Sequence, residues 1–167
     1  KLKLQALNSV CSLLEKFLPE RQNYSQIFNA TNAFIDLLTL QDERRYDYWM
    51  EGYVKWEIGI LSSIGFSLDL KQCAVTGANT NLLYVSPKTG KAVSKEGAGR
   101  HAPRLLLLPF FLGGDKVISS NFYNEILAGL NITSYFFKNK LLLSINTNKP
   151  MNLPYSRIRF VELIEKL

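Results

Sequence analysis

Few side chains in this 167-residue sequence are of the types that perform covalent catalysis. It has one histidine, His101, and two cysteines, Cys11 and Cys73. A nucleophilic site needs a base beside the nucleophile, and the sequence separates His101 from both thiols. It has no phosphate-cradling glycine loop, no dinucleotide fingerprint and no Gly-x-Ser-x-Gly motif. The acidic side chains fall mostly on the first three helical segments, with the spacing of solvated faces. We therefore expect no enzyme activity and no cofactor, and we expect Cys11 to be a small buried group in a helix.

One stretch has the outline of a zinc knuckle that has lost its second cysteine, Cys73-Ala-Val-Thr-Gly77. Zinc takes four nitrogen or sulfur ligands in a tetrahedron, but Thr76, Ser94 and Gly97 occupy the positions where a zinc ribbon would place the others. One thiol falls far short of that count, so we expect no metal. We expect the knuckle shape to persist through hydrogen bonds and packing, with Cys73 as the relic of a ligand set.

Positive charge is concentrated in the middle of the chain. The net charge is +6, yet residues 71–116 carry seven basic and two acidic side chains, whereas residues 1–70 carry seven basic and nine acidic ones. Such a local surplus attracts polyanions and acidic peptides over about one Debye length, about 10 Å at 0.1 M salt. A solvated loop that needs charge for solubility would show the same pattern. The candidate binding residues of this region, called the basic set below, are Lys88, Lys91, Lys95, Arg100 and Arg104.

Three amphipathic helices are predicted before this region. Apolar residues at three- and four-residue steps indicate helices over residues 2–18, 24–40 and 42–64. Pro19 ends the first helix, and Asp42 is a suitable N-cap for the third. The first helix should bury Leu4, Leu7, Val10, Leu14 and Phe17 or Leu18, and the third should bury Tyr46, Trp49, Tyr53, Trp56, Ile60 and Ile64.

Helical periodicity disappears between residues 67 and 103. Leu82–Ser86 and Lys91–Ser94 have the character of two short strands, joined by a turn over Pro87–Gly90. An isolated hairpin is marginal in water, so this one must lean on the helices or on a partner. Tyr84 could stack on a nucleic-acid base, but the alternation along its strand favours packing against the bundle.

Helical character returns near residue 117, where Ser119 or Ser120 can cap a helix that continues to residue 137. Pro154 suits the first turn of a last helix, whose inner face should carry Ile158, Val161, Leu163 or Ile164, and Leu167. We predict a mainly α fold, a bundle of about five or six helices with a small β-hairpin insertion of degenerate zinc-ribbon character at about 67–103. We treat 1–167 as one helical domain. Because the sequence begins with Lys1, we expect it to be a fragment or a processed product.

Several runs of the sequence carry a family resemblance. They are Trp56–Leu61, Ile64–Leu70, Cys73–Gly77, Leu83–Ser94, Leu106–Leu112, Gly129–Thr133, Tyr135–Phe136 and Ser156–Phe160. Together they resemble the C-terminal part of the bacterial RecO family of DNA repair and recombination mediators, in its proteobacterial version without zinc ligands. The resemblance runs from about residue 45 to the end, and its most specific motif is the Tyr-Val-Ser-Pro-Lys stretch at 84–88. The first two helices fit the family in character only.

The resemblance implies the helical part of a protein whose N-terminal OB-fold is absent from this chain. It implies binding to single- and double-stranded DNA, annealing of complementary strands, and loading of RecA together with RecR onto strands coated by single-stranded-DNA-binding protein. The helical domain would dock the acidic, Phe-ended tail of that coating protein, which needs an apolar pocket beside a basic rim. No nucleotide hydrolysis or metal chemistry is implied. A cytoplasmic, nucleoid-associated protein without membrane contact is expected, and two cysteines fit a reducing compartment.

Two arginines of the last helix join the basic set as candidates for binding DNA or the acidic tail. Arg157 and Arg159 are two positions apart and point to different faces, so we expect one to pair with a carboxylate and the other to meet a ligand. The aromatic side chains at 110, 111, 136 and 137 are predicted to lie in the core or at a domain interface.

Two other functions remain open. A helical protein- or ligand-binding domain of a regulator, with no nucleic-acid role, would show a deep cavity lined by Trp49, Tyr53 and Phe136. An enzyme would need Cys73 and His101 within hydrogen-bond reach.

Overall fold

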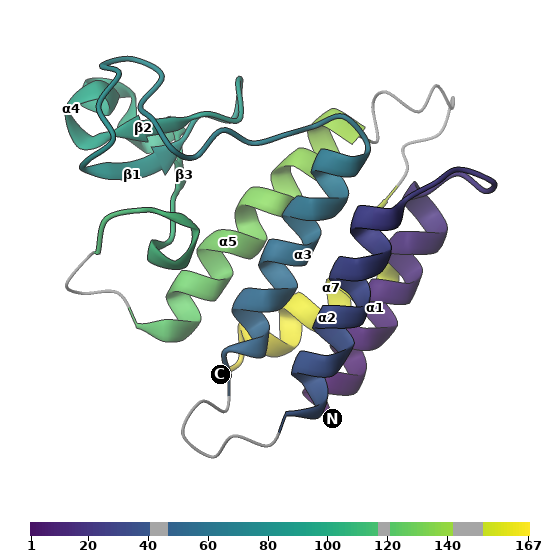
Figure 1. Cartoon of the computed structure of the whole chain (residues 1–167). Helices are drawn as coiled ribbons and strands as arrows, with labels where there is room; N and C mark the ends of the chain where they lie inside the picture. The colour runs from purple at the N-terminus through teal and green to yellow at the C-terminus, as the bar shows by residue number, and fades with distance from the viewer. Residues whose placement is uncertain (41–46, 117–120, 142–151) are drawn as a thin grey trace.

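The computed structural model describes residues 1–40, 47–116, 121–141 and 152–167. It confirms the predicted class, a mainly α fold with a small β insertion (Figure 1). None of the described helices has the length and apolar character to cross a membrane. The elements in chain order are α1 (Leu2–Phe17), α2 (Ser25–Thr39), α3 (Trp49–Ser63), β1 (Leu82–Val85), β2 (Ala92–Ser94), α4 (Lys95–Ala98), the 3-10 turn η1 (Gly99–Arg104), β3 (Leu106–Leu107), the 3-10 turn η2 (Phe110–Leu112), α5 (Phe122–Phe136), the π-helical turn η3 (Phe137–Leu141) and α7 (Tyr155–Ile164).

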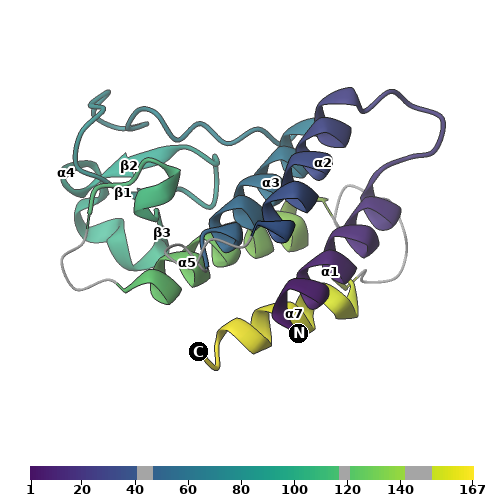
Figure 2. The ribbon, with the colours of Figure 1, turned by 60° about the horizontal axis from the view of Figure 1, so that its bottom comes forward.

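The long helices pack in pairs around one apolar core. Helix α1 lies along α7, α2 lies along α3, and α3 lies along α5, as Figure 2 shows from below. Aromatic rings join these pairs: Phe17 of α1 stacks on Phe137 with ring centroids 5.2 Å apart, and Tyr53 of α3 meets Phe160 of α7 at 4.5 Å. The bundle is therefore held mainly by burial of large apolar side chains.

The predicted faces of the first and last helices need correction. In α1 the buried stripe is Ala6, Ser9, Val10, Leu13 and Phe17, so Leu4 is exposed. Cys11 lies outside this stripe and is exposed as well, contrary to the prediction. In α7 the buried apolar residues are Phe160 and Ile164, whereas Ile158 and Leu167 face outward. In both helices apolar residues occur on more than one side. The side that is buried in each is set by the contact between α1 and α7.

The third helix starts later than predicted. It begins at Trp49, and the amide of Met50 donates to the carbonyl of Asp47 at 2.9 Å in the preceding turn. The predicted cap Asp42 and Tyr46 lie outside the described residues. The rest of the predicted stripe is confirmed, with Ile64 half-buried and the others buried; the buried members are Trp49, Tyr53, Trp56 and Ile60.

Helix α5 begins at Phe122 and is capped by Asn121, whose side-chain oxygen accepts from the amide of Asn124 at 2.8 Å. The predicted caps, Ser119 and Ser120, lie outside the described residues. The last helix starts at Tyr155, so Pro154 is at the N-cap position, one residue before the first turn.

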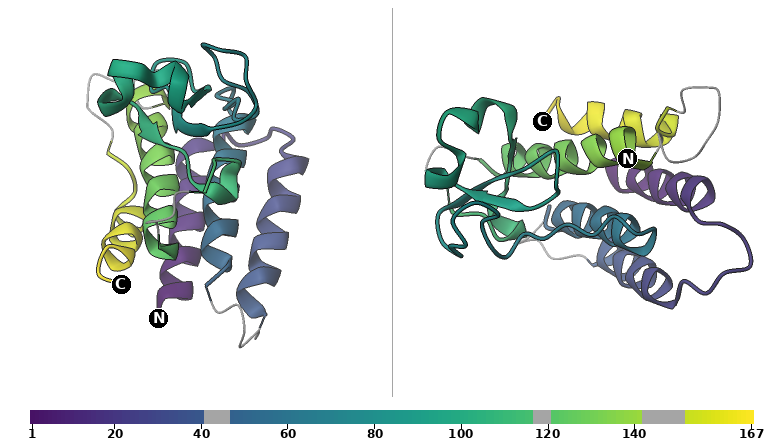
Figure 3. Two further views of the ribbon diagram at one scale, coloured as in Figure 1. Left: turned by 90° about the vertical axis from the view of Figure 1, so that its left-hand side faces the viewer. Right: turned by 90° about the horizontal axis from the view of Figure 1, so that it is seen from above.

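The insertion forms a three-stranded antiparallel sheet in the order β2-β1-β3 at one end of the bundle (Figures 1 and 3). The predicted hairpin is confirmed, and its turn is closed by a hydrogen bond from the amide of Gly90 to the carbonyl of Ser86 at 2.8 Å. Gly90 has φ +71°, and a Cβ there would lie 2.9 Å from Leu68 Cδ2, so both conformation and space require glycine. Strand β3 was not predicted; it pairs with β1 and contacts α5. Tyr84 is half-buried and packs against the core, as the strand alternation indicated.

Candidate nucleic-acid interface

The basic set lies on the turn of the hairpin and on the two short helices between β2 and β3. Lys88 and Lys91 are in the turn between β1 and β2, Lys95 opens α4, and Arg100 and Arg104 are in η1. All five residues are exposed. The structure therefore puts the whole set on the insertion and its immediate continuation, away from the paired helices α1 and α7 (Figure 1).

Four cations of the basic set have no carboxylate partner among the described residues. The ion pairs found there involve none of Lys91, Lys95, Arg100 and Arg104. The nearby acidic residue Glu96 accepts a hydrogen bond from the amide of the Asn81 side chain at 3.3 Å instead. These positive charges are not neutralised within the described part of the chain, so they can interact with an anionic polymer.

The two arginines of α7 diverge as their spacing indicates. Arg159 is half-buried and its guanidinium pairs with Glu162 at 3.0 Å, with both side chains partly in solvent. Arg157 is 2% exposed and is bound to Glu57 of α3. The prediction that Arg157 contacts DNA or an acidic tail is therefore corrected, because its guanidinium is buried and bound to Glu57.

Glu57 and Arg157 form the centre of a buried polar network. Arg157 Nε donates to Glu57 Oε1, and Arg157 Nη2 donates to Glu57 Oε2, both at 3.0 Å. Tyr53 donates to the same carboxylate at 2.8 Å, and Thr133 also donates to it. Ser9 in turn bonds the Tyr53 hydroxyl at 2.6 Å. The network thus joins α1, α3, α5 and α7, and no buried side-chain polar atom of the described residues lacks a partner.

The electrostatics of this network favour the ion pair. Burial alone would lower the pKa of Arg157, but the charge and hydrogen bonds of Glu57 outweigh it and raise that pKa above its ordinary value. Burial, followed by the charge of Glu57, raises the pKa of Tyr53 well above its ordinary value, so its hydroxyl remains a donor. The pair is a structural centre between the helices: the Glu57 side chain is fully buried and the Arg157 side chain is 3% exposed.

The sequence did not identify Glu57, because its acidic neighbours were interpreted as solvated faces. A signal was present: Glu57 lies four residues after Tyr53 and three before Ile60, within the predicted core stripe of its helix. A carboxylate on an apolar face must find a buried partner, since an unpaired one would be very costly. The partner, a hundred residues later on α7, could not be read from local spacing.

The Cys73 corner keeps the shape of a knuckle. The Cys73 sulfur is buried and accepts amide hydrogen bonds from Val75 and Thr76 at 3.4 Å and from Ser94 at 3.2 Å. Ser94 Oγ accepts from the amide of Gly97 at 3.0 Å. The prediction that hydrogen bonds hold this shape is confirmed, with Thr76, Ser94 and Gly97 around the surviving thiol. The described residues contain no group of three His, Cys, Asp or Glu side chains able to hold a metal ion.

Hydrogen bonding also changes the acidity of this thiol. Burial would raise its pKa, but hydrogen bonds from Ser94 and then Thr76 outweigh burial and lower the pKa of Cys73 to about 6. The hydrogen bonds to the sulfur come from Val75, Thr76 and Ser94, and His101 is exposed and is not among the donors. The Cys–His arrangement that an enzyme would need is therefore not formed.

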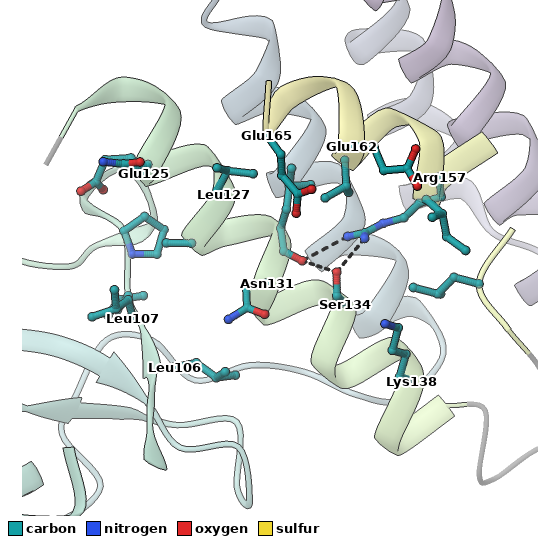
Figure 4. Close-up of a pocket in the computed structure, with 18 of the residues that line it drawn as sticks. Leu106, Leu107, Glu125, Leu127, Asn131, Ser134, Lys138, Arg157, Glu162 and Glu165 are labelled. Atoms are coloured by element: carbon teal, nitrogen blue, oxygen red, sulfur yellow. Dashed lines mark hydrogen bonds between the residues drawn. The ribbon is translucent and has the colours of Figure 1, made fainter. Parts of the chain in front are cut away.

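A groove of about 930 Å³ runs along α5 (Figure 4). Its floor is the outward face of α5 from Asn124 to Ser134, continued by Lys138 of η3. One wall is β3 with its flanking residues 105–109, and the other wall is α7. It begins at Leu105, next to Arg104 in the sequence, but no member of the basic set lines it. The expected combination of an apolar pocket with the basic set as its rim is thus not seen at this groove.

The cavity expected of a ligand-binding regulator is not formed by the residues named for it. Trp49, Tyr53 and Phe136 are buried in the core and line neither the groove along α5 nor a second pocket beside Phe17 and Tyr24. Phe136 and Phe137 are core residues, as predicted, whereas Phe110 is 59% exposed and is not part of the core.

Comparison with known proteins agrees with the resemblance drawn from the sequence. The family described as "Recombination protein O C terminal" matches residues 2–149. The DNA repair protein RecO of Ruegeria sp. (strain TM1040) is 39% identical over 166 residues, covering 99% of this chain and 64% of that protein. The corresponding protein of Jannaschia sp. (strain CCS1) is 42% identical over 163 residues, covering 98% and 62%. That of Rhodospirillum rubrum is 38% identical over 164 residues, covering 98% and 63%.

No solved structure matches the chain significantly. The chain spans less than two thirds of the length of each of these three relatives. Their match nevertheless extends over nearly all of this chain, including the hairpin insertion and the last helix, and the family match covers most of it. This chain belongs to the family of recombination protein O C-terminal domains.

Proposed function

We propose that this chain is the helical part of a non-enzymatic recombination mediator in DNA repair, and that it holds DNA through the basic set. The observation that carries the proposal is the group of exposed cations on the insertion, four of which have no carboxylate partner among the described residues. Its relatives are DNA repair proteins by name. To this role we add the binding surface, which is the basic set, and the mode of binding, which is contact with the phosphate backbone.

The chemistry of the basic set suits the phosphate backbone of DNA. Arg100 and Arg104 can bond two phosphate oxygens at once, while the three lysines act as point charges. Contacts of this kind position a strand without reading its sequence, so single- and double-stranded DNA are both acceptable. The helical bundle supports the hairpin and positions its cations, and it takes part in no covalent reaction.

The same cations would accept the acidic tail of single-stranded-DNA-binding protein. An Asp-rich tail and a DNA strand are both polyanions, so they should compete for one surface. By binding the tail, this protein would then release single-stranded-DNA-binding protein from the strand. The freed strand could anneal to its complement or be loaded with RecA. RecR is the third proposed partner; it follows from the family, and no described residue is assigned to it.

Binding of labelled single-stranded DNA, followed by fluorescence anisotropy, tests the proposal. The double charge reversal Lys91→Glu/Arg104→Glu should weaken binding by about 1–3 kcal/mol, because two contacts become repulsive. The matched control Lys1→Glu/Lys16→Glu changes the net charge equally on α1 and should bind almost as the unaltered protein. Equal losses in both variants would mean that total charge, not this surface, attracts the strand.

An acidic peptide ending in phenylalanine, added to the DNA complex, tests the shared surface. It should displace the DNA from the unaltered protein at low salt. Simultaneous binding of both would contradict the shared surface while leaving the DNA site intact.

A further inference from the structure

The groove along α5 has the opposite charge character to the basic set. Three carboxylates line it, Glu125 of α5, Glu162 of α7 and Glu165 just after α7, against the two cations Lys138 and Arg157. In Figure 4, Glu125 lies at one end of the groove and Lys138 at the other, with Glu165 and Glu162 on the α7 side. The exposed lysine is therefore at the opposite end of the groove from Glu125.

The cations of the groove do little to neutralise its carboxylates. The Arg157 guanidinium is buried against Glu57 and also donates to Ser134 at 2.6 Å, as the dashed lines of Figure 4 show. Glu162 is paired with Arg159 at 3.0 Å, but its side chain remains 45% exposed. Glu165 is exposed at the C-terminal end of α7, where the helix dipole adds negative potential.

Apolar side chains from three elements also line the groove. Leu106 and Leu107 come from β3, Leu127 from the floor, and Ile158 and Val161 from α7. Leu107 is 59% exposed and Ile158 is 37% exposed, so these side chains present apolar surface on the outside of the protein. The floor from Glu125 to Lys138 is about 20 Å long at 1.5 Å per residue, enough for a short peptide.

We propose that this groove binds a polypeptide segment that combines apolar side chains with lysine or arginine. Its apolar side chains would cover the leucines of β3 and the α7 wall, and its cations would lie beside Glu165 and Glu162. An acidic segment is disfavoured here because its carboxylates would face those of the groove. The proposal is independent of DNA binding, since it concerns a different face and a partner of opposite charge.

A labelled peptide of alternating leucine and arginine is the probe, measured by fluorescence anisotropy on the whole chain. It should bind more tightly than the same peptide with glutamate in place of each arginine. Glu165→Lys should weaken its binding about fivefold or more, because it places a cation beside the peptide's own. Lys138→Glu should strengthen binding, since it removes the exposed cation of the groove.

Two further variants separate groove binding from general attraction to acidic surface. Glu20→Lys, in the loop after α1, makes the same charge change outside the groove and should leave the affinity almost unaltered. Leu107→Ser removes exposed apolar surface from β3 and should weaken binding about threefold at unchanged charge. Equal effects of Glu165→Lys and Glu20→Lys, or tighter binding of the glutamate peptide, would overturn the proposal. Neither result would contradict DNA binding by the basic set, which is measured separately.

Discussion

Arg157 and Arg159 show how strongly the role of a residue depends on its partner. The two are of one type and lie two positions apart, yet one is buried against Glu57 and the other lies half in solvent beside Glu162. A buried ion pair is not by itself a large source of stability, because both charges lose their water. Removing only one partner is costly, however, because the other charge then stays buried alone.

Replacing Arg157 by methionine should therefore destabilise the protein by about 3–5 kcal/mol. The matched variant Arg159→Met breaks a partly exposed pair and should cost at most about 1 kcal/mol. Urea unfolding followed by circular dichroism measures both. The double variant Glu57→Leu/Arg157→Met should recover part of the loss, since no uncompensated charge remains. Similar costs for Arg157→Met and Arg159→Met would show that the buried network is not the centre described here.

The thiol of Cys73 gives a prediction about pH. Its pKa in the folded protein is about 6, below the ordinary value of 9.0. Between these two values the unfolded chain binds more protons, so the contribution of Cys73 to stability rises with pH; it is complete above about 9 and is lost as the pH falls through 6. The difference in unfolding free energy between the unaltered protein and Cys73→Ala should widen from pH 6 to pH 9. A difference that stays constant over this interval would contradict a thiolate stabilised by hydrogen bonds from Ser94 and Thr76.

At the scale of elements, sequence periodicity predicted the long helices well and their ends less well. The bounds of α1 and α2 follow directly from apolar spacing, because such helices present one face to the core. The start of α3 at Trp49 was missed, since Asp42 offered an earlier capping residue. Strand β3 has two residues, too few for an alternating pattern, and it exists because β1 offers a pairing edge.

The contact between α3 and α5 depends on a glycine. A Cβ at Gly129 would lie 2.8 Å from Val54 Cγ1 and 3.0 Å from Phe111 Cζ, so the two elements meet where a side chain is missing. Gly129→Ala should destabilise the protein by about 1–3 kcal/mol through overpacking. Gly59→Ala, on the other hand, adds a Cβ 3.7 Å from Ile27 Cδ1 and should stabilise α3 by about 0.5–1 kcal/mol. Thermal unfolding of the two variants checks both signs, and a stabilising Gly129→Ala would refute the close approach.

At the scale of the whole molecule, two surfaces differ in charge and in shape. The basic set lies on the insertion, whereas the groove between β3, α5 and α7 is lined by three carboxylates. The excess of positive charge in the middle of the chain was evident from composition, because it lies in one short segment. The groove was not evident from the sequence, since its lining residues are up to 82 positions apart. Only packing brings Leu83 and Glu165 to the same groove.

The salt dependence of single-stranded DNA binding tests most directly whether the basic set contacts phosphate. Each phosphate contact contributes a slope of about −0.7 to the logarithm of the binding constant against the logarithm of salt concentration. If Lys91 and Arg104 each neutralise a phosphate, the variant Lys91→Glu/Arg104→Glu should have a slope shallower by about 1.4, while Lys1→Glu/Lys16→Glu should keep the original slope. An unchanged slope in the first variant would contradict the assignment of these cations to DNA.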